Sequence, residues 1–111
     1  VVVPLMTRFA KVIEVNAARL LLLRAAYEID LGNDARDWIS MVKVHATETL
    51  GRVADRAVQL FGGMGYCKDL PIEQLYRDSR IARIYDGTSE IHRILVARGV
   101  LKKGASLFDL V

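Results

Sequence analysis

Hydrophobic residues recur at steps of three and four positions along two long stretches of the chain. The first stretch runs from Leu5 to Leu31 and contains no glycine or proline. The second runs from Ala35 to Phe61 and is interrupted only by Gly51. Because this spacing matches the 3.6-residue turn of an α-helix, the pattern predicts two long helices over these ranges.

Helix-ending residues follow both stretches. Gly32 stands after the first, where a left-handed C-terminal cap is expected. A cluster of glycines follows the second and predicts a break or tight turn there; it consists of Gly62, Gly63 and Gly65.

Two shorter helices are expected in the rest of the chain. Pro71 favours the first turn of a helix over residues 71–77, and hydrophobic spacing predicts another over residues 89–102. The tail after Gly104 is expected to be mobile unless it docks on a partner. Together these elements predict an all-α fold, an up-and-down helical bundle that leaves apolar surface for a missing helix or another subunit.

The composition excludes several classes of protein. With 111 residues, 52% hydrophobic and 26% charged, the chain is expected to form one domain over residues 1–111. The net charge is only +3 and its basic residues are dispersed, so no nucleic-acid partner is expected. No apolar run approaches the roughly 20 residues of a transmembrane helix. The opening Val1-Val2-Val3-Pro4 has no initiator methionine and no signal-peptide pattern, so the chain is expected to be a fragment.

Cysteine and histidine add little candidate chemistry. Cys67 is the only cysteine, which rules out an internal disulfide and favours a reducing compartment. His45 and His92 lack thiol companions at zinc-ligand spacing, so no metal site is predicted. His45 lies on the apolar side of the second helix, where we expect a packing role, with Glu48 available as a partner.

Candidate chemistry is concentrated in residues 84–93, with the sequence IYDGTSEIHR. Gly87 permits a sharp turn, which would place Asp86 on a bend. Thr88 or Ser89 can cap the helix that follows, and the early Glu90 favours the positive end of its dipole. These ten residues alone fit either an ordinary capped loop or a site for an anionic or polarised group.

Three motifs in order resemble the acyl-CoA dehydrogenases. They are QLFGGMGY at residues 59–66, LYRDSR at 75–80 and IYDGTSEIHR at 84–93, with ARLLLLRAA at 18–26 extending the likeness to about residues 18–101. The resemblance implies the C-terminal FAD- and acyl-CoA-binding and oligomerisation domain. The first helix of that bundle, and the two domains that precede it in the family, have no counterpart here.

The resemblance also implies an activity. In the family, FAD takes a hydride from the β-carbon of an acyl-CoA while a carboxylate, here Asp86, removes the α-proton and a backbone N–H bonds the thioester oxygen. The remaining implied contacts are Thr88 and Glu90 with FAD of the same subunit, Gln59, Gly62 and Gly63 with FAD of a neighbouring subunit, and Tyr85 and Gly87 with the substrate. Tyr85 fits simple core packing equally well.

One departure leaves alternatives open, since most members of the family carry glutamate at the position of Asp86. An aspartate base is found in some relatives and in nitroalkane oxidases of the same superfamily, so a nitroalkane-oxidase-like flavoenzyme is one alternative. A non-catalytic helical assembly module is another. The main hypothesis implies an acyl-CoA substrate, an electron-transfer flavoprotein or similar acceptor, and a homodimer or homotetramer. The compartment would be the cytoplasm of a bacterium or a mitochondrial matrix.

Overall fold

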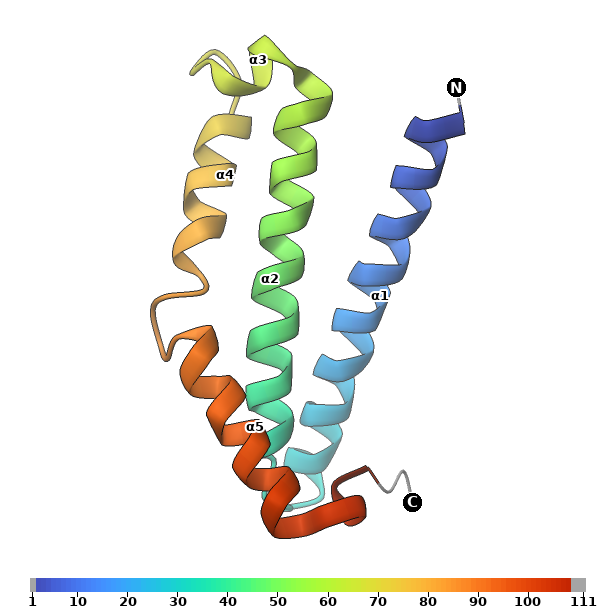
Figure 1. Ribbon diagram of the computed structural model, residues 1–111, viewed down its shortest axis with the longest axis vertical. Helices are drawn as coiled ribbons and strands as arrows, with labels where there is room; N and C mark the ends of the chain where they lie inside the picture. The colour runs from blue at the N-terminus through green and yellow to red at the C-terminus, as the bar shows by residue number, and fades with distance from the viewer. Residues whose placement is uncertain (1, 109–111) are drawn as a thin grey trace.

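The chain folds entirely into helices joined by short connections. The computed structural model describes the backbone of residues 2–108 and the side chains of residues 11–104, 106 and 107. The elements in order are α1 (Val2–Asp30), α2 (Arg36–Phe61), α3 (Gly63–Tyr66), α4 (Ile72–Ile81), α5 (Ser89–Lys103) and the 3₁₀ helix η1 (Gly104–Phe108). Figure 1 shows α1 running down, α2 running back up, and α4 and then α5 running down one after the other beside α2. This confirms the all-α, up-and-down arrangement.

Gly32 ends α1 in the way its position predicts. Its φ of +73° is left-handed, which glycine adopts without steric cost. The N–H of Gly32 donates to the Ile29 carbonyl at 2.9 Å, and the N–H of Asn33 donates to the Glu28 carbonyl at 2.9 Å. This pair of bonds is a Schellman motif, which satisfies two of the last carbonyls of the helix and turns the chain toward α2.

The helix bounds agree with the sequence pattern at most ends. The predictions for α2 and α5 differ from the structure by a single residue at one end. α1 begins at Val2, before the predicted Leu5, because proline is tolerated in the first turn of a helix. α4 extends to Ile81, beyond the predicted end at residue 77, because no glycine or proline follows until Gly87.

The glycine cluster after α2 forms more than a break. Gly62, with φ +57°, ends α2, and residues 63–66 then form the single turn α3. Gly65 is buried, and a Cβ atom there would lie 2.8 Å from the Val58 carbonyl oxygen and 2.9 Å from the Phe61 Cβ. The absence of a side chain at Gly65 therefore lets α3 fold back onto the end of α2.

α2 is the central element, because α1, α3, α4 and α5 all pack against it. Near its first turn, α5 approaches closely at Gly99, where a Cβ would lie 2.5 Å from the Asp37 Oδ1 atom. Lys103 Nζ donates to Asp37 Oδ2 at 2.6 Å in the same region. On the other side, Glu14 of α1 pairs with Arg52 at 3.2 Å and Arg56 at 3.3 Å.

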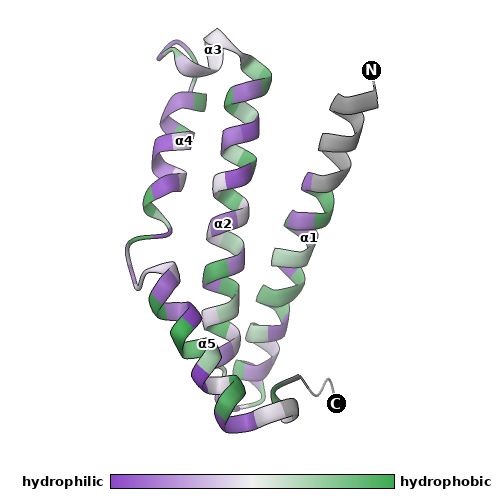
Figure 2. Ribbon diagram, in the orientation of Figure 1, coloured by the Kyte–Doolittle hydropathy of each residue, from purple (hydrophilic) through white to green (hydrophobic). Residues whose placement is uncertain are grey.

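The described residues bury little hydrophobic side-chain volume. The buried hydrophobic residues are Ala25, Ala35, Ala82 and Leu107, and no large side chain is fully buried. The accessible surface is 8138 Å², against about 6,100 Å² for a compact monomer of this mass. Figure 2 shows hydrophobic positions recurring along all the long helices. The chain therefore presents apolar faces that it does not cover itself, as the sequence predicted.

The tail folds back instead of extending from the domain. η1 packs against α5, and Leu107 is 5% exposed. Leu107 lines a cavity together with Arg24 and Trp38, so the tail caps the end of the bundle where α1 and α2 meet. The prediction of a mobile tail after Gly104 is therefore corrected as far as Leu107, and residues 109–111 lie outside the described part.

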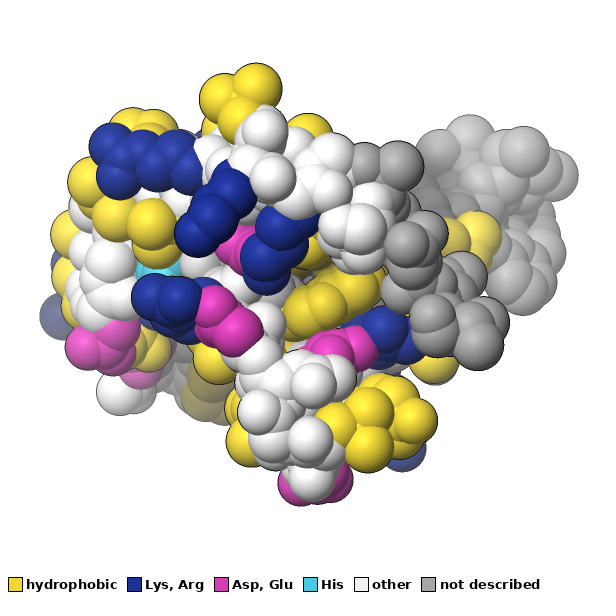
Figure 3. All heavy atoms as spheres, turned by 90° about the horizontal axis from the view of Figure 1, so that it is seen from below, with side chains coloured by type: hydrophobic (Ala, Val, Ile, Leu, Met, Phe, Trp, Pro, Cys, Tyr) yellow, Lys and Arg dark blue, Asp and Glu magenta, His cyan; other side chains and the backbone are white. Residues whose placement is uncertain are grey.

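Charged side chains on the lower face lie in mixed groups. Figure 3 shows Lys and Arg side chains next to Asp and Glu side chains there. The ion pairs near this end of the bundle include Arg36–Asp34 at 2.5 Å and Lys103–Asp37 at 2.6 Å. Within the residues that the structure describes, none of the helices is long and apolar enough to cross a membrane.

Substituting Gly65 tests the close contact between α3 and α2. Gly65→Ala is expected to lower the free energy of unfolding of the complete protein by about 1–3 kcal/mol, because the new methyl group overlaps backbone that cannot move away. Gly63→Ala is the matched control, since a Cβ at Gly63 meets nothing within 4 Å. Urea unfolding curves measure both. Equal stability of the two variants would contradict the proposed packing.

Candidate active site

Asp86 lies at the tip of the connection between α4 and α5. Its φ is +53°, and it is the residue other than glycine for which the described backbone records a left-handed conformation. Backbone bonds close the connection at its two ends, from the Tyr85 N–H to the Ile81 carbonyl at 3.2 Å and from the Ser89 N–H to the Arg83 carbonyl at 3.2 Å. Asp86 is exposed, so its carboxylate is open to a reaction partner.

Gly87 is required by both its conformation and its surroundings. Its φ is +92°, and a Cβ at this position would lie 2.7 Å from the Nε2 atom of His92. The same His92 Nε2 lies 3.3 Å from the Asp86 carbonyl oxygen, while Nδ1 lies 3.2 Å from the Ser40 hydroxyl on α2. One imidazole ring thus packs against the bend and links it to the central helix.

Thr88 is the residue that caps α5. The Ile91 N–H donates to its hydroxyl oxygen at 3.3 Å, which settles the choice between Thr88 and Ser89. Glu90 follows in the first turn, where its own backbone N–H and the Thr88 hydroxyl both bond its carboxylate and lower the pKa of that group. This geometry confirms the N-terminal helix signal seen in the sequence.

Thr88 and Glu90 line a polar cavity of about 330 Å³ between α2, α4 and α5. Two buried polar atoms of its lining have no hydrogen-bond partner, the Ser89 hydroxyl and the Arg83 Nε. The other lining residues are Glu48, Arg80, Ile84 and Arg93. Because a buried polar group without a partner is destabilising, these atoms fit a ligand that carries oxygen acceptors.

Arg83 lines this cavity with its side chain against α2. A Cβ at Gly51 would lie 3.8 Å from the Arg83 Nη2 atom, so the guanidinium lies against the bare backbone of α2 at Gly51. Arg93, by contrast, is paired with Glu48 at 2.6 Å. The cavity therefore combines Arg83, whose Nε has no partner, with Arg93 beside Glu48 and Arg80 near Glu90.

The remaining site residues from the sequence analysis lie in two places. Tyr85 adjoins Asp86, is 50% exposed, and has the Lys43 Nζ 4.5 Å from its ring centroid. Gln59, Gly62 and Gly63 lie exposed at the far end of α2, about 16 Å along the helix from Glu48 at 1.5 Å per residue. The structure does not bring these three together with Asp86 within one chain.

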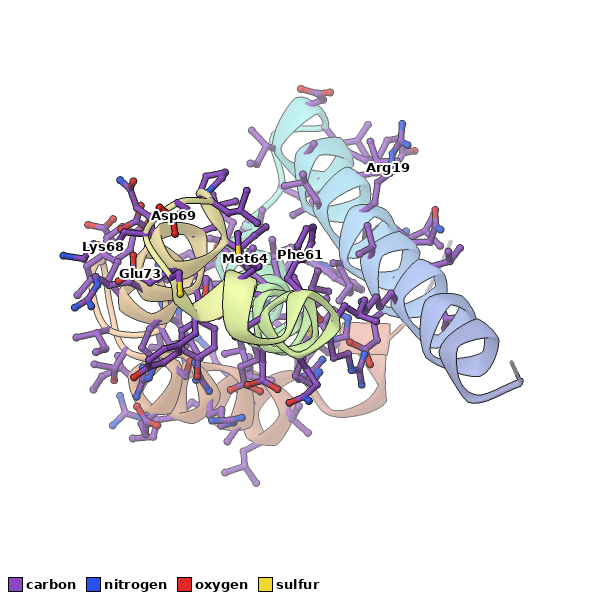
Figure 4. All side chains as sticks on the ribbon, turned by 90° about the horizontal axis from the view of Figure 1, so that it is seen from above. Arg19, Phe61, Met64, Lys68, Asp69 and Glu73 are labelled. Atoms are coloured by element: carbon purple, nitrogen blue, oxygen red, sulfur yellow. The ribbon has the colours of Figure 1, made fainter. Side chains whose placement is uncertain are left out.

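Figure 4 looks down on that far end of the bundle. It shows Phe61 and Met64 there, Lys68, Asp69 and Glu73 on the adjoining connection and α4, and Arg19 on α1 apart from them. A groove of about 860 Å³, larger than the polar cavity beside Asp86, also lies at this end between α2 and α4. It contains none of the site residues that the sequence predicted, so size does not identify the active site here.

No role in the site was predicted from the sequence for three residues, Ser40, Arg83 and His92. His92 stood inside the motif, but its partner Ser40 is 52 positions away, and no helical spacing joins them. Arg83 offered a weak signal, as a charge between apolar neighbours. His45 does lie against other helices as expected; its Nε2 atom is buried without a partner, while Glu48 pairs with Arg93.

Comparison with known proteins places this geometry in a family. The sequence model of the acyl-CoA dehydrogenase, C-terminal domain, matches residues 7–101. The chain is 46% identical over 87 residues to the acryloyl-CoA reductase (NADH) of Anaerotignum propionicum, which covers 78% of this chain and 22% of that protein. The chain belongs to the acyl-CoA dehydrogenase C-terminal domain family.

Solved structures agree with this assignment. Butyryl-CoA dehydrogenase from Megasphaera elsdenii matches with a TM-score of 0.78 and 32% identity over 80% of this chain and 23% of that one. A structure of PigA with FAD and proline matches with a TM-score of 0.77 and 29% identity over 83% and 24%. The chain thus spans about a quarter of the length of the proteins it matches.

Removing the Thr88 hydroxyl tests the link between the cap and Glu90. In Thr88→Ala, the pKa of Glu90 is expected to rise toward its ordinary value, because the carboxylate loses one of its two donors. Thr88→Ser is the control and keeps the low pKa. NMR titration of the Glu90 carboxyl measures the change.

The sign of the pH effect follows from the lowered pKa. The Glu90 carboxylate contributes stability above its ordinary pKa of about 4.3, and this contribution is lost as pH falls through the lower folded value. An unchanged Glu90 titration in Thr88→Ala would contradict the proposed bond.

Proposed function

We propose that the complete protein is a flavin-dependent acyl-CoA dehydrogenase in which Asp86 removes the α-proton of an acyl-CoA thioester. The observation that carries this proposal is an exposed carboxylate on a left-handed bend, fastened by His92 and placed directly before the capped N-terminus of α5. The family to which the chain belongs supports the reaction class.

Asp86 is suited to the role of a base by what surrounds it. No ion pair of the described residues involves Asp86, so its carboxylate is free to accept a proton. A thioester α-proton is weakly acidic, so the base also needs water excluded and the developing negative charge bonded by N–H donors. Parts of the protein beyond this chain would supply the exclusion of water. In the reverse direction the same carboxyl group would return the proton.

The polar cavity beside Asp86 fits the flavin cofactor. Ser89 and Arg83 present a hydroxyl and a guanidinium donor to it, and each has a buried polar atom without a partner, while Thr88 and Glu90 complete this side of the lining. We infer that these residues hold part of FAD. When bound, FAD accepts the hydride that leaves the β-carbon.

Assembly of several copies would complete the cofactor site. Gln59, Gly62 and Gly63 lie too far along α2 to reach the same part of FAD, so we infer that they contact FAD bound to a neighbouring copy. The uncovered apolar faces support a homodimer or homotetramer, and exposed hydrophobic area of this extent is typical of interfaces. An electron-transfer flavoprotein or similar acceptor would then reoxidise the flavin.

Replacing the base tests the reaction. In the complete protein, Asp86→Asn is expected to lower the rate of anaerobic flavin reduction by an acyl-CoA by at least about 100-fold, since an amide cannot accept the proton. Asp69→Asn, at another exposed aspartate, is the matched control and keeps the rate. Stopped-flow absorbance of the flavin, with short-, medium- and long-chain acyl-CoAs, measures both.

Two results would contradict the proposal. Undiminished reduction in Asp86→Asn would remove Asp86 from the role of base. Reduction of the wild-type flavin by nitroethane but by no acyl-CoA would favour a nitroalkane-oxidase-like enzyme.

The apolar faces generate a separate prediction about assembly. Ile13 and Leu20 are 70% and 66% exposed on α1. Replacing both with asparagine is expected to weaken self-association of the chain by at least about tenfold, because each buried side chain contributes about 1.5–3 kcal/mol. Arg19→Gln, at an exposed position of the same helix, is the control. Sedimentation velocity over a range of concentrations measures association, and a strictly monomeric wild-type chain would contradict it.

A further inference from the structure

His92 connects the bend that carries Asp86 to the central helix. It lies in the second turn of α5 and is half-buried between the bend and α2. Its Nδ1 atom is 3.2 Å from the hydroxyl of Ser40, which is 3% exposed, and its Nε2 atom is 3.3 Å from the Asp86 carbonyl oxygen. Both ring nitrogens therefore face oxygen atoms of segments that are distant in sequence.

The chemistry of these two oxygens assigns the protons of the ring. A carbonyl oxygen only accepts hydrogen bonds, so Nε2 must carry a proton to bond Asp86. In the neutral ring Nδ1 is then the acceptor, and the Ser40 hydroxyl donates to it. The Asp86 carbonyl thus selects the tautomer that can hold the bend, and the buried Ser40 hydroxyl, which can donate or accept, bonds the other nitrogen as a donor.

Packing adds a second restraint to the hydrogen bond. The ring occupies the space where a side chain at Gly87 would lie, since a Cβ there would be 2.7 Å from Nε2. Two consecutive residues, Asp86 at φ +53° and Gly87 at φ +92°, adopt left-handed conformations directly over this ring. A left-handed conformation outside glycine persists only where the surroundings enforce it, and His92 provides that enforcement.

Fixing the peptide between Asp86 and Gly87 fixes two groups at once. The Cβ atom and the backbone nitrogen of Asp86 are both bonded to its Cα, so a defined φ and a held carbonyl determine the directions of the Cα–Cβ bond and of the backbone N–H. These are the groups that the proposed reaction uses, one on the α-proton and the other on the thioester oxygen.

We propose that His92, with its Nδ1 atom bonded to Ser40 of α2, is a positioning residue that holds Asp86 in the orientation needed for proton abstraction. This inference rests on the proposed function. It adds residues that never contact the substrate and that act only through the geometry of the bend.

The test compares variants of the complete, FAD-loaded protein. His92→Leu removes both bonds, and a misplacement of about 1 Å in a reacting group costs on the order of 100-fold in rate. The expected result is a fall of that size in the flavin reduction rate, with the dissociation constant of the acyl-CoA changed less than about threefold. His92→Gln is expected to restore most of the rate, because its amide N–H can donate to Asp86 and its amide oxygen can accept from Ser40.

Two further variants complete the design. Ser40→Ala leaves the ring and its bond to Asp86 but removes the hydroxyl that ties Nδ1 to α2, so a smaller loss of rate is expected. His45→Leu, at the other histidine and away from the bend, is expected to keep the wild-type rate. Nitrogen-15 NMR of His92 gives a readout independent of turnover, with a protonated Nε2 and an acceptor Nδ1 in the wild type.

The outcomes separate this inference from the proposed function. A wild-type flavin that acyl-CoA reduces normally, together with equal rates in His92→Leu, would overturn the positioning role alone. So would a glutamine variant no faster than the leucine variant, or a ring with its proton on Nδ1. A wild-type flavin that no acyl-CoA reduces would overturn the proposed function, and the inference with it.

Discussion

α2 is the element on which every other part of the structure depends. α1 packs on one side of it, and α4 and α5 pack on the other. A glycine of a neighbouring helix contacts α2 closely near each end, Gly99 of α5 near the start and Gly65 of α3 at the end. Because so few hydrophobic side chains are buried, these contacts and the ion pairs across α2 fix the relative positions of the helices. The bend at Asp86 is linked to the same helix, because His92 contacts both Ser40 of α2 and the Asp86 carbonyl.

The candidate active site combines rigid support with an open face. Thr88 caps α5, His92 bonds the bend, and Arg83 lies against α2 at Gly51 beside the polar cavity. Among the residues that the structure describes, none covers Asp86, which is exposed to water. This division is consistent with a domain that spans about a quarter of the proteins it matches, in which precise orientation and desolvation come from different parts of the protein.

The sequence predicted those features that depend on local chemistry. The helix period located α1, α2 and α5, Gly32 marked a left-handed cap, and the motif around Asp86 predicted the bend before α5. It could not predict contacts between distant positions. Ser40 and His92 meet only because two helices cross, and Gly65 is buried only because α3 folds back on α2. The docking of Leu107 depends in the same way on packing, whereas the longer α4 follows from the absence of glycine and proline before Gly87.

The left-handed backbone at Asp86 bears on why an aspartate stands where most of the family has a glutamate. Short polar side chains tolerate this conformation better than longer ones, because they bond to their own neighbouring backbone. A glutamate would extend the carboxylate by one methylene toward a substrate, but it would adopt this left-handed conformation at a higher energy cost. For the proposed reaction, aspartate at this position therefore balances the reach of the carboxylate against the conformation of the backbone.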